Sequence, residues 1–316
     1  MIATADTDFA RAVVEGLSQH PRVIPARYFY DRRGSELFEA ITRLPEYYLT
    51  RTEVALLRQH GPDIARLTGK DRVLVEFGSG SSAKTPLLLG PVNPIAYVPI
   101  DISADYLFDA AEGLAAMHPG LAVLPLAGDF TASPALPAAV ADAPKLGFFP
   151  GSTIGNMSHR AAVQLLGAFR ETLGEEACLV IGIDTRKDPR LIEAAYNDAA
   201  GTTAAFNLNL LHRINRELDG TIPVFAFEHR ALWNDSLGRI EMHLVAREAV
   251  RFKAAGHSFH LQAGESIHTE NSYKYTLQEA RLLARAAGWE PLNVWTDPDG
   301  LFALHVWAAE PNRIET

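Results

Sequence analysis

A short glycine-containing segment carries the clearest chemical signal in the sequence. An apolar run that includes Glu76 is followed directly by Gly78 and Gly80, and then by a helical pattern. Glycines between a strand and a helix let the backbone turn tightly and approach a ligand closely. Asp101 ends the next apolar run, where a carboxylate can accept hydrogen bonds from both hydroxyls of a ribose. These residues predict a binding site for a nucleoside-containing cofactor.

The glycine segment fits two cofactors. With Ala83, and with Asp101 about 20 residues on, it satisfies the dinucleotide fingerprint of NAD-binding proteins. Glu76 favours S-adenosylmethionine instead, because its carboxylate could meet an ammonium group, whereas the same charge would repel a phosphate. Asp129 follows the third apolar run, where methyltransferases often place a carboxylate near the adenine amine. We therefore expect S-adenosylmethionine, with an NAD-dependent oxidoreductase as the alternative.

Histidine and cysteine residues do not predict a metal site. The single cysteine, Cys178, can form neither an internal disulfide nor a cysteine cluster, and its apolar neighbours predict a buried thiol. Among the 11 histidines, His257, His260 and His268 form the only group close in sequence, together with Glu265. This group lacks the His-Glu-x-x-His spacing of zinc enzymes. We expect no bound metal.

The elements around the glycine segment predict a parallel α/β sheet. Short apolar runs alternate with helical patterns from Arg72 to Asp184, which is typical of strands joined by helices. Strands are predicted at 73–77, 95–100, 121–126, 145–150 and 178–183, and helices at 82–89, 103–117 and 158–173.

The flanking regions predict a second domain. Outside the alternating core, helices are predicted around 37–44, from about residue 52, at 191–218 and at 276–287. Strands are predicted at 222–229, 239–247, 291–296 and 301–308. The last two strands form a hairpin through the turn 297–300. We therefore assign 51–185 and 275–316 to a Rossmann-like cofactor-binding domain. We assign residues 1–50 and 186–274 to an α+β substrate-binding domain.

Composition limits the partners. The chain has 316 residues and a formal net charge of −9, which argues against nucleic-acid binding. Its 47% hydrophobic and 21% charged residues are typical of a globular protein. No apolar stretch approaches the ~20 residues that span a bilayer, and the N-terminus has no apolar signal core. We expect a cytoplasmic monomer that acts on a small molecule.

Several long segments of the sequence are specific enough to compare with a known family. They are 29–38, 41–48, 76–85, 149–156, 205–211, 240–245 and 268–275, and they are spread over essentially the whole chain. These segments resemble the histidine-specific α-N-methyltransferases of ergothioneine biosynthesis. Leu49 departs from the proline that usually follows the paired tyrosines, which should alter that loop slightly. The resemblance implies a class I methyltransferase fold. It also implies the transfer of three methyl groups from S-adenosylmethionine to the α-amine of L-histidine, giving hercynine.

The resemblance also implies roles for individual residues. Cofactor contacts carry over to Gly78, Lys84, Asp101, Asp129 and Phe130. The resemblance assigns the substrate carboxylate to Asn156 and Tyr196, and places the amine near Tyr47, at the catalytic position. It assigns the imidazole to Glu270 and Ser272, with Met242 shaping the pocket.

Residue chemistry gives some of these positions independent support. Asn156 follows the fourth strand, on the ligand side of an α/β sheet, although it could instead cap the helix that begins near Ser158. Glu270 and Ser272 are two apart, so an extended backbone would point both to one side and let them grip both imidazole nitrogens. A solvated loop is the alternative there.

The reaction itself favours an aromatic pocket. Methyl transfer needs a neutral amine held close to the methyl carbon, and its cationic product suits aromatic ring faces. Tyr47, Tyr48, Tyr196 and Phe206 are candidates, with ordinary core packing as the alternative. Two other functions stay open: the same transfer to another aromatic amino acid such as tryptophan, and a non-catalytic sensor of S-adenosylmethionine.

Overall fold

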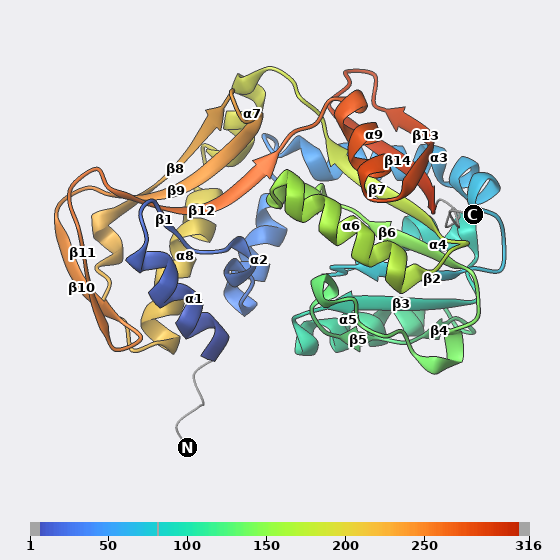
Figure 1. The fold of residues 1–316 in the computed structure, drawn as a ribbon, viewed down its shortest axis with the longest axis horizontal. Helices are drawn as coiled ribbons and strands as arrows, with labels where there is room; N and C mark the ends of the chain where they lie inside the picture. Colours follow the sequence, from blue (N-terminus) through green and yellow to red (C-terminus); the bar gives the residue numbers. More distant parts are fainter. Residues whose placement is uncertain (1–6, 81, 310–316) are drawn as a thin grey trace, which may run out of the picture. The chain divides into compact units, whose positions relative to one another are not determined.

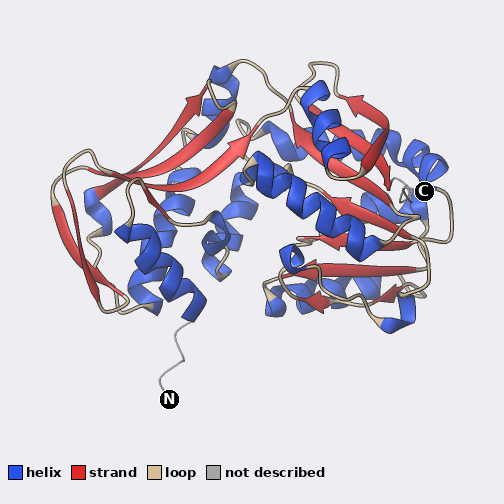
Figure 2. Ribbon diagram, viewed as in Figure 1, coloured by secondary structure: helices blue, strands red, loops and turns tan. Residues whose placement is uncertain are grey.

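The computed structural model describes residues 7–80 and 82–309 and divides into two compact units (Figures 1 and 2). Unit 1 comprises Met1–Tyr48 and Lys187–Tyr273, and unit 2 comprises Leu49–Arg186 and Lys274–Thr316. Ser81 of the glycine segment and the two chain ends lie outside the described residues. The assignment of cofactor and substrate to separate domains stays a prediction.

Unit 2 is built on an eight-stranded sheet, which confirms the predicted class I methyltransferase architecture. The strands are β2 (Val73–Phe77), β3 (Ala96–Asp101), β4 (Ala122–Val123), β5 (Leu126–Ala127), β6 (Lys145–Phe149), β7 (Cys178–Asp184), β13 (Trp289–Thr296) and β14 (Phe302–Ala309). Their order is β13-β14-β7-β6-β2-β3-β4, with β5 also paired to β3. β14 is antiparallel to both its neighbours. Every residue of β2, β6 and β7 is buried, as expected for strands covered on both faces.

Helices connect the strands of unit 2. They are α3 (Tyr48–Thr68, starting at the unit boundary), α4 (Pro86–Val92), α5 (Ala104–Met117), α6 (His159–Leu173) and α9 (Leu277–Ala286). The helix predicted at 82–89 instead begins at Pro86, because proline lacks an N–H and suits the first turn. The strand predicted at 121–126 is split into β4 and β5 next to Pro125, which cannot donate to a ladder. The segment between β5 and β6 contains a short 3₁₀ turn at Ala138–Val140.

Unit 1 contains a four-stranded sheet in the order β1-β12-β9-β8. Its strands are β1 (Arg22–Val23), β8 (Phe227–Asn234), β9 (Arg239–Ala246) and β12 (Ser266–Tyr273), and β10 (Val250–Ala254) pairs with β11 (His257–Leu261) in a separate hairpin. The strand predicted at 222–229 begins only at Phe227. Strands β10 and β11 were not among the predicted strands.

The helices of unit 1 are α1 (Thr7–Ser18), α2 (Arg32–Ile41), α7 (Pro189–Tyr196) and α8 (Thr202–Glu217). The single helix predicted at 191–218 is wrong, because the chain breaks after Tyr196. The Asp198 carboxylate accepts from the backbone N–H groups of Thr202 and Thr203 at 2.8 and 2.7 Å, which starts a new helix. Gly201 has φ +73°, a conformation that favours glycine.

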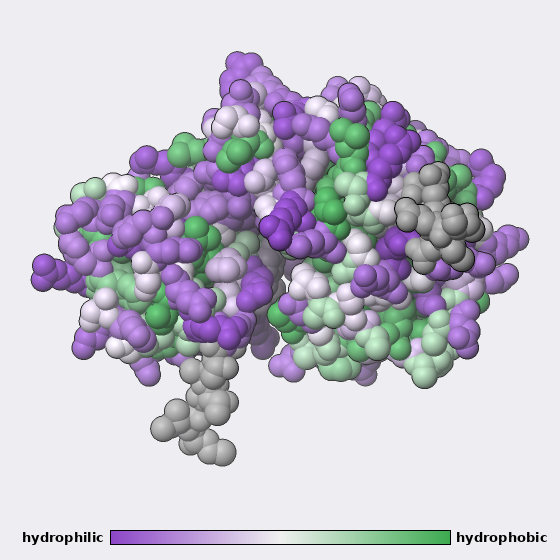
Figure 3. Space-filling model, viewed as in Figure 1, coloured by the Kyte–Doolittle hydropathy of each residue, from purple (hydrophilic) through white to green (hydrophobic). Residues whose placement is uncertain are grey.

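The viewed surface is predominantly hydrophilic, with apolar residues in scattered small patches (Figure 3). Among the described residues, no helix combines the length and the apolar character needed to cross a bilayer. Cys178 is buried on β7, as predicted.

Candidate active site

The glycine segment lies at the carboxyl end of β2. Gly78 and Gly80 have φ values of +72° and +49°, and the Gly78 N–H donates to the Ile100 carbonyl at 2.8 Å. A Cβ atom at Gly78 would lie 3.2 Å from the Phe130 ring, whereas one at Gly80 would meet no atom within 4 Å. The loop is therefore closely packed at its first glycine and open at its second, which fits close approach of a ligand.

Asp101 is brought to this loop by the end of β3. Its Oδ2 accepts from the Gly80 N–H at 2.9 Å, and its Oδ1 accepts from the Ser103 N–H at 2.9 Å. Each carboxylate oxygen has two lone pairs, so both retain capacity for a ribose hydroxyl. The donor set therefore fits the nucleoside part of S-adenosylmethionine.

Glu76 is part of a buried network behind the loop. Its side chain is 1% exposed, and its Oε2 accepts from Thr85 Oγ1 at 2.6 Å and from the Tyr97 hydroxyl at 2.5 Å. Burial raises the pKa of Glu76 to about 7. Since the carboxylate is engaged inside the unit and only partly ionised near neutrality, its contact with a cofactor ammonium stays a prediction.

The raised pKa of Glu76 predicts a pH-dependent stability. The folded state holds this proton more tightly than the unfolded chain, so stability is full below about pH 4.5 and falls as pH rises towards about 7. Glu76→Gln removes the titration, and we expect a flatter profile with a difference on the order of 1–3 kcal/mol. Urea denaturation of both proteins at pH values from about 5 to about 8 measures the free energy of unfolding as a function of pH. Parallel profiles for both proteins would contradict the assignment.

Lys84 forms an ion pair with a carboxylate that the sequence analysis missed. Its Nζ lies 2.5 Å from Oε2 of Glu53, which is 0% exposed on α3. Both Glu53 oxygens accept from the Gly151 N–H at 3.0 Å, and a Cβ at Gly182 would lie 2.0 Å from Oε1. Glu53 therefore ties Lys84 to the loop after β6. The signal was available, because Glu53 interrupts the apolar face that contains Leu49.

The remaining predicted residues of unit 2 lie in loops after strands. Asp129 accepts from the Thr131 N–H at 2.8 Å and its hydroxyl at 2.6 Å, and the Phe130 ring centroid is 5.8 Å from that of Phe149. Asn156 ends a 3₁₀ turn, Thr153–Asn156, that follows β6. Its alternative role as a helix cap is wrong, because Ser158 caps α6.

In unit 1 the predicted substrate residues gather around Tyr196. The Tyr196 hydroxyl donates to Ser272 Oγ at 2.9 Å, and the Tyr47 and Tyr196 ring centroids are 6.3 Å apart. All three side chains are buried. Two aromatic rings and a hydroxyl therefore converge from α7, β12 and the residue before α3.

The strand register adds Glu270 and Met242 to one face of the sheet. Glu270 is opposite Met242 and Ser272 is opposite Ile240 across β12 and β9. Residues directly opposite share a face, so Glu270 and Ser272 point to the same side as Met242. The solvated-loop alternative is wrong, because the segment is a paired strand.

Two other aromatic candidates differ in their surroundings. Phe206 packs among rings, with its centroid 4.6 Å from Phe29 and 6.0 Å from Phe38. The Tyr48 hydroxyl accepts from Lys187 Nζ at 2.8 Å, and the same ammonium lies 4.5 Å from the ring centroid. Tyr48 is therefore already paired with a cation of the protein.

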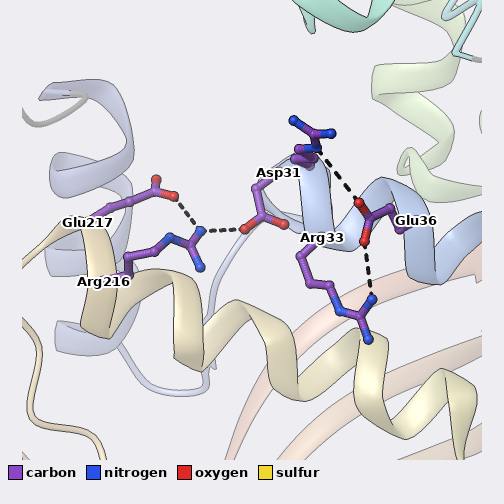
Figure 4. A pocket seen from close by; sticks show the side chains of 6 residues that line it. Asp31, Arg33, Glu36, Arg216 and Glu217 are labelled. Carbon is purple, nitrogen blue, oxygen red and sulfur yellow. Dashed lines mark hydrogen bonds and ion pairs between the residues drawn. The ribbon is translucent and has the colours of Figure 1, made fainter.

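A surface hollow of about 350 Å³ in unit 1 lies among charged residues (Figure 4). Arg216 bridges Asp31 and Glu217, and Glu36 pairs with Arg33 at 3.2 Å. Opposite charges balance in this hollow and most of its groups are exposed, so the ion pairs add little stability. None of the predicted substrate residues lines it, and we assign it no catalytic role.

The structure regroups the histidines. His268 is not combined with His257, His260 and Glu265, the group singled out from sequence, but lies near Glu241 and His243. Strand pairing across β9 and β12 brings these three together, which spacing along the chain did not reveal.

Comparison with known proteins identifies the family. Residues 9–309 match the model of a family described as "Histidine-specific methyltransferase, SAM-dependent". The chain belongs to this family. S-adenosylmethionine is accordingly its cofactor, and the open glycine segment with Asp101 fits that molecule.

Curated relatives of this histidine-specific methyltransferase match nearly its whole length. "Histidine N-alpha-methyltransferase" from Mycolicibacterium smegmatis is 40% identical over 304 residues, covering 93% of this chain and 92% of the relative. A protein of the same name from Mycobacterium tuberculosis is 38% identical, covering 94% of each. "Ergothioneine biosynthesis protein 1" from Neurospora crassa is 29% identical over 91% of this chain and 33% of the relative.

Proposed function

We propose that this chain catalyses trimethylation of the α-amino group of L-histidine to hercynine, as a step of ergothioneine biosynthesis. Its relatives named for histidine N-alpha-methylation, at 38–40% identity over nearly the full length, support the substrate. The relative named for ergothioneine biosynthesis supports the pathway. The observation that carries the proposal is the cluster in unit 1, where the rings of Tyr47 and Tyr196 lie beside the Ser272 hydroxyl, on the strand that also carries the Glu270 carboxylate.

Different residues of unit 1 bind different parts of the imidazole ring of histidine. Glu270 and Ser272 provide an acceptor and a hydroxyl on one face of β12, which suits the two nitrogens of an imidazole. Tyr196 holds Ser272 in place through its hydroxyl. A site built to hydrogen-bond a polar ring rejects apolar side chains, because its own buried groups would be left unpaired.

The remaining residues hold the amino-acid backbone and the cofactor. Tyr47 is assigned to the amine and Asn156 with Tyr196 to the carboxylate, while Gly78, Gly80, Lys84, Asp101, Asp129 and Phe130 hold S-adenosylmethionine. When bound, that cofactor supplies an electrophilic methyl group on a sulfonium. The protein's contribution is to position a neutral amine and to present aromatic faces to its methylated, cationic forms.

Asp101→Ala is expected to weaken S-adenosylmethionine binding by roughly 10- to 100-fold, the value of a lost hydrogen bond to a charged group. The substitution also removes the acceptors for Gly80 and Ser103. Isothermal titration calorimetry with the cofactor measures the change. Asp109→Ala, at an exposed position of α5, is the matched control and should bind normally. Unchanged affinity in Asp101→Ala would remove this carboxylate from the cofactor site.

The function is tested by incubating the purified protein with S-adenosylmethionine and all twenty amino acids, followed by mass spectrometry. Three added methyl groups on histidine alone are the expected result. Methylation of another amino acid would overturn the imidazole assignment. Binding of the cofactor without any transfer would favour a sensor.

A tryptophan-type substrate is the second candidate. A more distant relative from Aspergillus fumigatus, 26% identical over 91% of this chain, is named "4-dimethylallyltryptophan N-methyltransferase easF". The mixture experiment separates the two, because the products differ in mass. We further propose that the chain is a cytoplasmic monomer, which light scattering and cell fractionation would test.

A further inference from the structure

Three metal-ligating side chains meet on one face of the unit 1 sheet. Glu241 and His243 are two residues apart on β9, so both point to the same face. His268 on β12 is directly opposite His243, which places it on that face as well. One donor atom from each of the three lies within 4.8 Å of those of the other two. The residues assigned above to the imidazole of the substrate occupy the opposite face.

Hydrogen bonds orient two of these three side chains. Oε1 of Glu241 accepts from Asn234 Nδ2 at 2.9 Å and from Arg239 Nε at 2.7 Å, while its Oε2 lies 3.2 Å from His243 Nε2. His243 Nδ1 lies 3.3 Å from Ser266 Oγ. Outer partners of this kind orient the ligands of metal sites.

His268 supplies a nitrogen that the chain itself does not satisfy. Within residues 7–80 and 82–309, its buried Nε2 has no hydrogen-bond partner. Its ring centroid is 5.0 Å from that of His243. Buried polar atoms are normally paired, so an unpaired nitrogen on a ring beside two other metal-ligating side chains points to a group from outside the chain. The side chains of Glu241 and His243 are 16% and 18% exposed, so solvent reaches the group.

We propose that Glu241, His243 and His268 form a binding site for Zn²⁺, with water completing the coordination. Two imidazoles and one carboxylate are a normal ligand set for zinc. Magnesium is disfavoured, because it prefers oxygen ligands in an octahedron. The guanidinium of Arg239 beside Glu241 reduces the negative charge of the site, which favours exchangeable binding. This site goes beyond histidine methylation and does not depend on it.

Bound zinc would cross-link two strands. It would join β9 to β12, the strands that carry Met242 and Glu270 on their other face. Anything that binds the folded state alone stabilises it. We therefore expect zinc to raise the melting temperature of the protein.

The test is a titration of the metal-free, full-length protein with zinc chloride, followed by calorimetry. Substrate and cofactor are left out, because free histidine itself binds zinc. One zinc per chain is expected, together with a higher melting temperature, and magnesium should produce neither effect. His243→Ala and His268→Gln should each weaken zinc binding by roughly tenfold or more. His260→Gln is the matched control, because this histidine is exposed on β11 outside the group.

Glu241→Gln is a conservative third ligand variant. It keeps the shape of the side chain, so a loss of zinc binding in this variant would not be caused by misfolding. Circular dichroism of each variant without metal checks the fold. If Glu241→Gln, His243→Ala and His268→Gln all bind zinc as tightly as the control variant His260→Gln, the proposed site is overturned. Absence of saturable zinc binding by the wild-type protein would overturn it as well.

Discussion

Replacing Lys274 by methionine is expected to lower the free energy of unfolding by about 3–5 kcal/mol. Its Nζ lies 2.7 Å from Oδ2 of Asp184, and both side chains are 0% exposed. Without the lysine, the Asp184 carboxylate stays in a low-dielectric interior and loses its counter-charge. Urea denaturation followed by circular dichroism measures the loss.

Two further variants make this result specific. Lys253→Met replaces an exposed lysine on β10 and should change the free energy by no more than about 0.5 kcal/mol. Adding Asp184→Asn to Lys274→Met should recover part of the loss, since no unpaired charge is then buried. If Lys274→Met unfolds at the same urea concentration as the wild type, the buried pair is not what stabilises this part of unit 2.

Glu270→Ala is expected to raise the KM for histidine by roughly 10- to 100-fold, as expected for loss of a charged hydrogen-bond acceptor. The affinity for S-adenosylmethionine should stay the same, because the residues assigned to the cofactor belong to unit 2. Steady-state kinetics with both ligands, and calorimetry for the cofactor alone, measure the two effects separately.

The controls for Glu270 distinguish charge from shape. Glu270→Gln keeps the size and one acceptor, and we expect a smaller increase in KM. Glu228→Ala removes a carboxylate on β8 that pairs with Arg230 and Arg247, and histidine kinetics should be unaffected. An unchanged KM for histidine in Glu270→Ala would remove this residue from the imidazole site.

The strands of unit 2 were the most predictable part of the fold. β2, β6 and β7 are buried along their whole length, and each is a mostly apolar run with clear limits in the sequence, interrupted only by Glu76 in β2, Lys145 at the start of β6 and Asp184 at the end of β7. The hairpin β10–β11 was missed, although Val250, Phe252 and Ala254 alternate with exposed residues. Five-residue strands with charged alternate positions give a weak signal. The break after Tyr196 was missed because the capping role of Asp198 depends on a local turn.

The candidate site was predictable where the spacing of residues along one strand alone determines the face to which their side chains point. Two residues apart on one strand, Glu270 and Ser272 share a face whatever their neighbours are. The pairing of Glu270 with Met242 was not accessible in this way, because it depends on a register shift between His268 and Glu270. Glu53 interrupts an apolar helix face, which marks it as unusual, but its partners Lys84 and Gly151 are far away in the sequence, so its role could not be predicted.

The interleaved path of the chain has a consequence for how this protein is made. β1 (Arg22–Val23) pairs in parallel with Ile267 and His268 of β12, and β14 lies between β7 and β13. During synthesis on the ribosome, β1 emerges long before its partner strand β12. The sheet of unit 2 stays incomplete until β14, close to the end of the chain, has emerged. Neither unit can finish folding until nearly the whole chain has been synthesised, and such distant pairings slow folding. A truncation that removes β14 from the C-terminal end would therefore leave β7 and β13 without their shared neighbour.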